Sequence, residues 1–509
     1  MRSVQQLASP RISCTLSAVL FALLLTIVTR HAWAADGPQS ASNESVEDLR
    51  KALQEEKERL RVLEERLAKQ ERQSTTSSES ALTATQEKPK PTDSTPVSGS
   101  FGPDGFALKT ADGANVLRLR GNVSVDGRYF TDSYTPAAAD TWLVRRLRPT
   151  LEGTLDGRYD FRIMPDFGLG KSIVQDAWAS VRIQPWLVLT AGKFKAPLGL
   201  ERLQLEQFAR FIEPSLTADL LPYRDLGFKV GGVFAGGLLN YDVGVFDGVL
   251  DAGSTDGNSV PDFDSTGKFT LAGRVFVKPF PSLASGFFKG LGVGVATSYV
   301  NDRGVATAAT TTTLLANYKT TGQQPLFSYR GNTQIAGTFN NATIAQGIER
   351  RLVPQFSFYQ GPVGLLGEYV RVDQQVQRQI SVSGVRFATL RSDAWQVQAA
   401  VFLTGEAEGY DTATPLRSLG HGGFGAVEIV TRYHVIQFDD AAFEGGSSSF
   451  ANPTTAARAA HAIGVGINWY LSRNVKTQLN YEITHFAGGT VTGNRPDERV
   501  LTSQFALIF

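Results

Sequence analysis

Arginines at alternate positions between residues 117 and 162 are the side chains in this sequence best suited to hold a ligand. Residues 117–120 read Leu-Arg-Leu-Arg, and Arg146 and Arg148 repeat the spacing. On a β-strand, alternate side chains point to the same face. A guanidinium keeps its charge and presents a planar fork of donors, which suits oxyanions. The pattern therefore indicates a positively charged face on neighbouring strands.

Alternation assigns the charged side chains of this region to one face, which would line a lumen. The predicted lumen residues are Arg118, Arg120, Asp126, Arg128, Arg146, Arg148, Glu152, Arg158, Asp160 and Arg162. Arg145 falls on the opposite, outward face by the same parity. Two interpretations stay open. The arginines form a wall that attracts anions, or they pair with the interleaved carboxylates in a solvated lumen.

The elements that would position these arginines are strands, because a period of two dominates residues 101–509. Alternating stretches of ~10 residues, such as 475–483, are separated by turns and by long polar loops. A soluble β-sandwich would alternate as well, but three features favour a membrane barrel. The predicted exported chain lacks cysteine, and it stops on an alternating strand at Phe509. Aromatic residues, Tyr470 and Phe486 among them, recur near strand ends, where a membrane interface would place them. We expect an all-β fold, a transmembrane antiparallel β-barrel of about 16 strands.

Composition excludes several classes of protein. The 509 residues include 50 Lys and Arg against 49 Asp and Glu, which is not the basic surplus of a nucleic-acid binder. Cys14 is the only cysteine, so neither a disulfide framework nor a cysteine-based metal site is available. No cofactor is expected. Apart from the N-terminal stretch, no apolar run is long enough for a spanning helix.

The first hundred residues divide into three predicted segments. Residues 1–34 have the basic start, apolar centre and Ala-Trp-Ala end of a signal peptide, with a membrane anchor as the alternative. Residues 35–72 form a periplasmic segment whose heptads over 44–72 predict a short coiled coil or a lone charged helix. Residues 73–100, rich in Ser, Thr and Pro, predict a disordered linker before the barrel at 101–509.

An ordered series of short motifs gives the barrel region a family resemblance. It resembles the phosphate-selective porin O/P family of Gram-negative outer membranes across essentially all of 101–509. The matching pieces are 143–153 (LVRRLRPTLEG), 175–178 (QDAW), 192–202 (GKFKAPLGLER), 224–227 (RDLG), 244–248 (GVFDG), 359–364 (YQGPVG), 367–371 (GEYVR), 403–406 (LTGE), 466–471 (GINWYL) and the last strand. The resemblance implies a 16-stranded trimeric barrel in the outer membrane, with a loop folded inward to narrow a water-filled channel.

The resemblance also implies roles for particular residues. The constriction arginine pair corresponds to Arg145 and Arg146, the central aspartate to Asp176, and the basic residue that opens the inward loop to Arg202. For Arg145 this assignment conflicts with strand parity, and a bulge would reconcile the two. The inward loop carries Gln207 and Pro214 where phosphate-specific members have basic residues, although Arg210 lies nearby. We therefore expect weaker anion binding than in a phosphate channel.

The sequence predicts a passive porin for small anions such as phosphate, and it predicts no enzyme. The expected partners are membrane lipid, two further copies of this chain in a homotrimer, and the outer-membrane assembly machinery, which the Phe509 strand would recruit. Nucleic acid is not an expected partner. The alternatives are a general, weakly selective diffusion porin, an envelope tether that uses the coiled coil, and a barrel hydrolase. The histidines show no metal-ligand spacing and no GxSxG motif is present, which disfavours the hydrolase.

Overall fold

The computed structural model describes residues 54, 58, 61, 96–102, 105–131, 139–248, 268–280, 286–334, 339–411 and 413–509. The chain divides into two units, Met1–Asp93 and Ser94–Phe509. The predicted signal peptide and linker residues 73–95 lie outside the described residues. Within the predicted coiled coil, only Gln54, Glu58 and Arg61 are described, and they are helical.

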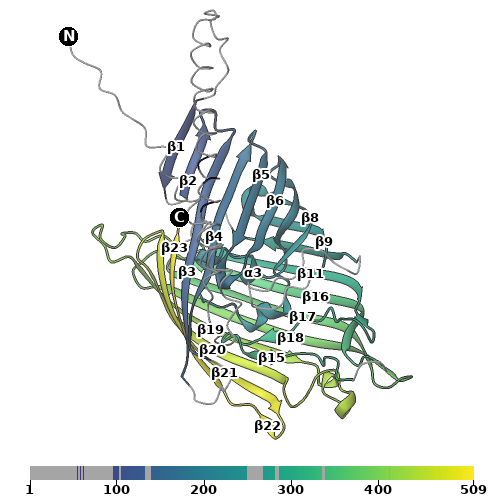
Figure 1. The fold of residues 1–509 in the computed structure, drawn as a ribbon. Helices are drawn as coiled ribbons and strands as arrows, with labels where there is room; N and C mark the ends of the chain where they lie inside the picture. Colours follow the sequence, from purple (N-terminus) through teal and green to yellow (C-terminus); the bar gives the residue numbers. More distant parts are fainter. Residues whose placement is uncertain are drawn as a thin grey trace, which may run out of the picture. The chain divides into compact units, whose positions relative to one another are not determined.

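Sixteen of the described strands form a closed antiparallel barrel (Figure 1). Each strand pairs with the next along the chain, and the last pairs with β3, so the barrel has no open edge. The strands are β3 (Val116–Phe130), β4 (Thr141–Leu155), β5 (Tyr159–Asp166), β6 (Ile173–Gln184), β7 (Leu187–Lys195), β8 (Arg224–Phe234), β9 (Leu239–Phe246), β10 (Thr270–Val277), β11 (Leu291–Arg303), β16 (Thr343–Gln360), β17 (Val363–Gln379), β18 (Val385–Phe402), β19 (Ala426–Phe438), β20 (Ala457–Tyr470), β21 (Val475–Thr490) and β23 (Glu498–Ile508).

Alternating burial along the strands confirms the predicted in–out pattern. On β20, Ile463, Val465 and Ile467 are each 51% exposed, whereas the residues between them are buried. Tyr470 and Phe486, which the sequence placed among the aromatic residues of the membrane interface, are buried instead. Among the residues that the structure describes, no helix has the length and apolar character needed to cross a membrane.

A long loop between β7 and β8, residues 196–223, folds into the barrel, and we call it the inward loop. It contains α3 (Leu200–Leu203), η2 (Glu206–Phe208) and η3 (Leu216–Leu220). Leu198, Leu216 and Leu220 pack with Tyr318 and Phe327 of a second connection, between β11 and β16, in one hydrophobic core. Two segments distant in sequence therefore fill part of the barrel together.

The remaining described elements are short. They are η1 (Gly168–Gly170), η4 (Ala235–Gly237), η5 (Phe287–Gly290), β12 (Val305–Ala306), β13 (Thr311–Thr312), β14 (Tyr318–Lys319), β15 (Pro325–Phe327), η6 (Asp440–Ala442), η7 (Gly446–Ser448) and β22 (Gly493–Asn494).

A hairpin of β1 (Val97–Gly102) and β2 (Gly105–Thr110) precedes the barrel. It corrects the predicted linker boundary, because Val97–Ser100 are in a strand. β2 pairs with β3 from Val116 to Leu119, whereas β23 pairs with β3 from Asn122 to Phe130. The two strands thus share one edge of β3, and the hairpin covers the part that β23 does not reach. This arrangement leaves no length of that β3 edge open.

Candidate functional site

A β-bulge decides the direction of the constriction arginines. Across the β3–β4 pair, Ser124 lies opposite Arg146 but Val125 lies opposite Val144, so Arg145 is the extra residue. A bulge breaks the alternation at one position. Both arginines are consequently buried, at 3% and 7% exposure. The outward direction that parity predicted for Arg145 is wrong.

Carboxylates of the inward loop meet these arginines. Glu213 lies 3.0 Å from Arg145 and 3.1 Å from Arg128. Glu206 forms ion pairs with Arg146 at 3.5 Å, with Arg148 and with Arg224 at 3.3 Å. Burial by itself would raise the pKa of Glu206, but the surrounding arginines outweigh it and hold that pKa well below its usual range. The loop is thereby bound to the barrel wall through charge.

The network continues along the wall from Glu206 to the start of β3. Arg224 binds Asp176 at 2.7 Å, and Arg162 lies 3.7 Å from the same carboxylate. Arg162 and Arg120 then share Glu152, at 2.6 and 3.1 Å. The structure therefore brings five predicted site residues into one chain of ion pairs: Arg120, Arg146, Arg148, Arg162 and Asp176.

The other predicted residues lie outside that chain of ion pairs. Arg118 is half-buried directly opposite Glu152 across the β3–β4 pair. Arg158 is exposed in the β4–β5 turn, which corrects its predicted place in the lumen. Arg202 is buried and donates two hydrogen bonds to the carbonyl oxygen of Ala218. Arg202 therefore joins two parts of the inward loop and does not bind the barrel wall through these hydrogen bonds.

The opposite side of the inward loop is held by further buried charges. Arg210 pairs with Glu408 of the β18–β19 connection and, at 3.2 Å, with Glu428 of β19. Burial by itself would lower the pKa of Arg210, but these two carboxylates raise it above its usual value. Arg432 bridges Glu482 at 2.7 Å and Glu201 of the inward loop at 3.4 Å. Ion pairs therefore join the inward loop to β4 and β8 on one side and to β19 on the other.

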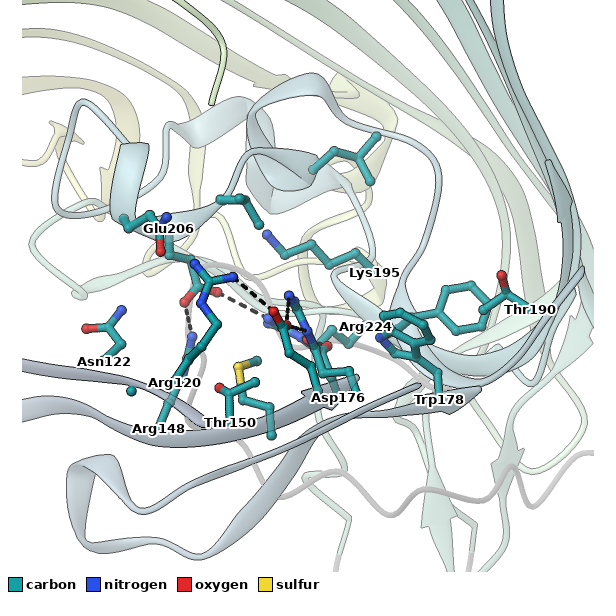
Figure 2. Close-up of a pocket in the computed structure, with 18 of the residues that line it drawn as sticks. Arg120, Asn122, Arg148, Thr150, Asp176, Trp178, Thr190, Lys195, Glu206 and Arg224 are labelled. Atoms are coloured by element: carbon teal, nitrogen blue, oxygen red, sulfur yellow. Dashed lines mark hydrogen bonds and ion pairs between the residues drawn. The ribbon is translucent and has the colours of Figure 1, made fainter. Parts of the chain in front are cut away.

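A cavity of about 430 Å³ lies between the inward loop and the wall from β3 to β8 (Figure 2). Its charged lining, among the described residues, comprises Arg120, Arg148, Arg162, Lys195, Arg224 and Lys229 against Glu152, Asp176 and Glu206. Phe509 also lines the cavity. Six basic side chains thus stand against three acidic ones in this charged lining.

The sequence left open whether the arginines attract anions or pair with the carboxylates interleaved among them. The structure shows arginines paired with carboxylates, but most of these carboxylates are not the interleaved ones. Only Glu152 and Asp160 of the interleaved acids bind arginines, Asp160 through Arg182 at 2.6 Å. Sequence reasoning missed Glu201, Glu206 and Glu213. The one signal available was their location in the 192–202 motif, which contains Glu201, and in the loop residues that follow it, which contain Glu206 and Glu213.

The closed barrel and its partly filled, charged lumen define an outer-membrane channel protein of the porin class. The family model of phosphate-selective porin O and P matches residues 117–504, and the chain belongs to this family. Its place is the outer membrane of a Gram-negative bacterium, and it works as a diffusion channel and not as an enzyme. The comparison with curated proteins gives no match.

Three of the solved structures with a similar fold are an outer membrane protein, a porin and an outer membrane channel. The outer membrane protein OmpT of Vibrio cholerae, folded in vitro, is 9% identical with a TM-score of 0.46, over 78% of this chain and 98% of that one. The anion-selective porin of Comamonas acidovorans is 12% identical with a TM-score of 0.45, over 78% and 100%. The outer membrane channel DcaP of Acinetobacter baumannii is 9% identical with a TM-score of 0.46, over 79% and 99%.

Proposed function

We propose that this porin passes small anions, phosphate among them, with a weak preference over cations. The observation that carries the proposal is the surplus of basic side chains around the cavity between the inward loop and β3–β8. The buried Arg145, Arg210 and Arg432, at the contacts between the inward loop and the barrel, each bind a carboxylate. Their charge is therefore largely balanced by a neighbouring group. This balance supports weak selectivity and not tight phosphate binding.

The ion pair between Arg120 and Glu152 gives a matched test of this preference. The two side chains are 22% and 14% exposed and line the same cavity. Arg120→Gln removes a positive charge and Glu152→Gln a negative one, while each breaks the same pair. A unit charge at ~8 Å in water contributes about 0.5 kcal/mol, which is about a twofold change in ion permeability.

The measurement is the reversal potential of planar bilayers under a KCl gradient. Because the charge acts with opposite sign on the two ions, we expect the chloride-to-potassium permeability ratio to fall about fourfold in Arg120→Gln and to rise about fourfold in Glu152→Gln. Equal shifts of one sign would indicate a change of pore shape and contradict the proposal. A ratio near one in the wild type and both variants would make the chain a general diffusion porin.

We also propose that three copies assemble and that the Phe509 strand is read by the outer-membrane assembly machinery. One solved structure with a similar fold is described as a trimer form. Light scattering in mild detergent should give the mass of three copies, and a monodisperse monomer would refute the trimer. If the trimer survives deletion of residues 44–72, the barrel and not the predicted coiled coil holds it. A porin should keep conducting after that deletion, whereas an envelope tether should lose its tethering function.

A further inference from the structure

Aromatic and aliphatic side chains occupy one part of the cavity lining, where a water-filled barrel would carry polar residues. Trp178 of β6 is half-buried and Phe194 of β7 is 6% exposed, and both line the cavity. Met164 and Val188 line it as well. Figure 2 shows Trp178 apart from the charged group around Arg148 and Glu206. The cavity therefore has a charged part and an apolar part.

Strand register places the apolar part beside basic residues. Trp178 lies directly opposite Arg162 on β5 and opposite Gly192 on β7. Gly192 has φ +123° and no side chain, so β7 contributes only backbone beside Trp178 at that level. On the other side, the Lys229 ammonium lies 5.5 Å from the centre of the Phe194 ring. Cations therefore flank the two aromatic rings.

Arg162 keeps donor capacity toward the cavity. It donates hydrogen bonds to Glu152 from Nε and Nη2, at 2.9 and 2.6 Å. Its Nη1 lies 3.7 Å from Asp176, beyond hydrogen-bond length. A guanidinium has five N–H donors, and these two bonds use two of them. A second carboxylate can therefore bind the same group, with its charge attracted by the basic surplus.

We propose that this cavity is a binding site for small aromatic carboxylates that pass through the channel. The ring packs against Trp178 and Phe194, and the carboxylate lies toward Arg162. Stacking on an indole removes apolar surface from water, which inorganic phosphate cannot do because all its oxygens need polar partners. A volume of about 430 Å³ is within the size range of small-molecule sites. The inference rests on the proposed anion channel and names its solute class.

The test uses benzoate as the probe in planar bilayers with the full-length porin in KCl. Benzoate should reduce the single-channel current in a saturable manner, and inorganic phosphate at equal charge concentration should reduce it less. Trp178→Ala should raise the half-blocking benzoate concentration about tenfold relative to the wild type. Trp178→Phe should keep most of the block, and it serves as a second variant if the alanine variant does not assemble.

Trp186→Ala is the matched control, because Trp186 is 45% exposed in the β6–β7 turn and stacks on Phe234 at 5.9 Å. Its block by benzoate should equal that of the wild type. Unchanged block in Trp178→Ala, equal block by cyclohexanecarboxylate, or stronger block by phosphate would each overturn the aromatic site. A wild type that conducts KCl with anion preference but shows no benzoate block refutes this inference alone. A wild type without channels or without anion preference refutes the proposed function.

Discussion

At the scale of single residues, most of the positive charge of this lumen is structural. Arg145 and Arg128 share the Glu213 carboxylate, and Arg145 and Glu213 are 3% and 4% exposed at their side chains. A buried charge is costly unless it is paired, so each of these groups depends on the other. The proposed anion preference therefore rests on the more exposed Arg120, Arg162 and Lys229 around the cavity.

Glu213→Gln tests that dependence. Removing the carboxylate takes away the buried ion-pair partner that Arg145 and Arg128 share, and we expect the free energy of unfolding to fall by about 3 kcal/mol. Urea titration of the refolded barrel in detergent, followed by tryptophan fluorescence, measures it. Asp160→Asn is the comparison, because its partner Arg182 is 45% exposed and that pair should contribute less than about 1 kcal/mol. Equal losses in the two variants would contradict the argument.

At the scale of elements, the β18–β19 connection clamps the inward loop. The Tyr410 hydroxyl donates to the Leu200 carbonyl, and the Leu205 amide donates to Asp411 at 3.0 Å. The third contact is the Arg210–Glu408 ion pair, with Glu428, Tyr359 and Lys476 around it. Burial raises the pKa of Glu408 to about 8, Arg210 opposes the rise and Glu428 adds to it. Protonation of Glu408 therefore relieves the repulsion between two carboxylates.

This clamp predicts a dependence of stability on pH. The folded pKa of Glu408 lies above the ordinary value of 4.5, so the folded barrel binds the proton more tightly than the unfolded chain. The contribution of Glu408 to the free energy of unfolding is complete below about pH 4.5, and it is lost as the pH rises through about 8. Urea midpoints measured from pH 5 to 9 should fall more steeply for the wild type than for Glu408→Gln. Parallel profiles would exclude Glu408 as the source.

Phe509 extends the pairing of β23 with β3 that closes the barrel. The Gly121 amide donates to the Phe509 carbonyl at 2.7 Å, and the Phe509 amide donates to Gly121 at 3.0 Å. A Cβ on Gly121 would lie 2.5 Å from the Phe509 ring, so the ring rests on the glycine backbone. Deletion of Phe509 should lower the heat-modifiable, folded fraction several-fold on gels of unheated samples. Phe505→Ala, which is 50% exposed on the same strand, should assemble normally. Equal folded fractions would show that closure does not need Phe509.

At the scale of the whole molecule, a sixteen-stranded closed barrel contains a lumen that two connections partly fill. The inward loop and the β11–β16 connection share a hydrophobic core that includes Leu216, Leu220, Leu315 and Phe327. The described lumen therefore holds a packed apolar region as well as the charged cavity. Strands satisfy their backbone groups through closure, whereas the inward segments bind through side chains on both walls.

The strands, the outward apolar face and the inward row of arginines follow from the sequence alone, because alternation is a local property of each strand. Arg120 and Arg148 line the cavity, as predicted, and their strand neighbours Leu119 and Leu147 are exposed. The tertiary structure turns Arg145 inward, because the bulge depends on pairing with β3. It also decided that Glu206 and Glu213 bind the arginines and that Trp178 lies opposite Arg162. These contacts join residues far apart in the chain, and no local pattern encodes which carboxylate reaches which guanidinium.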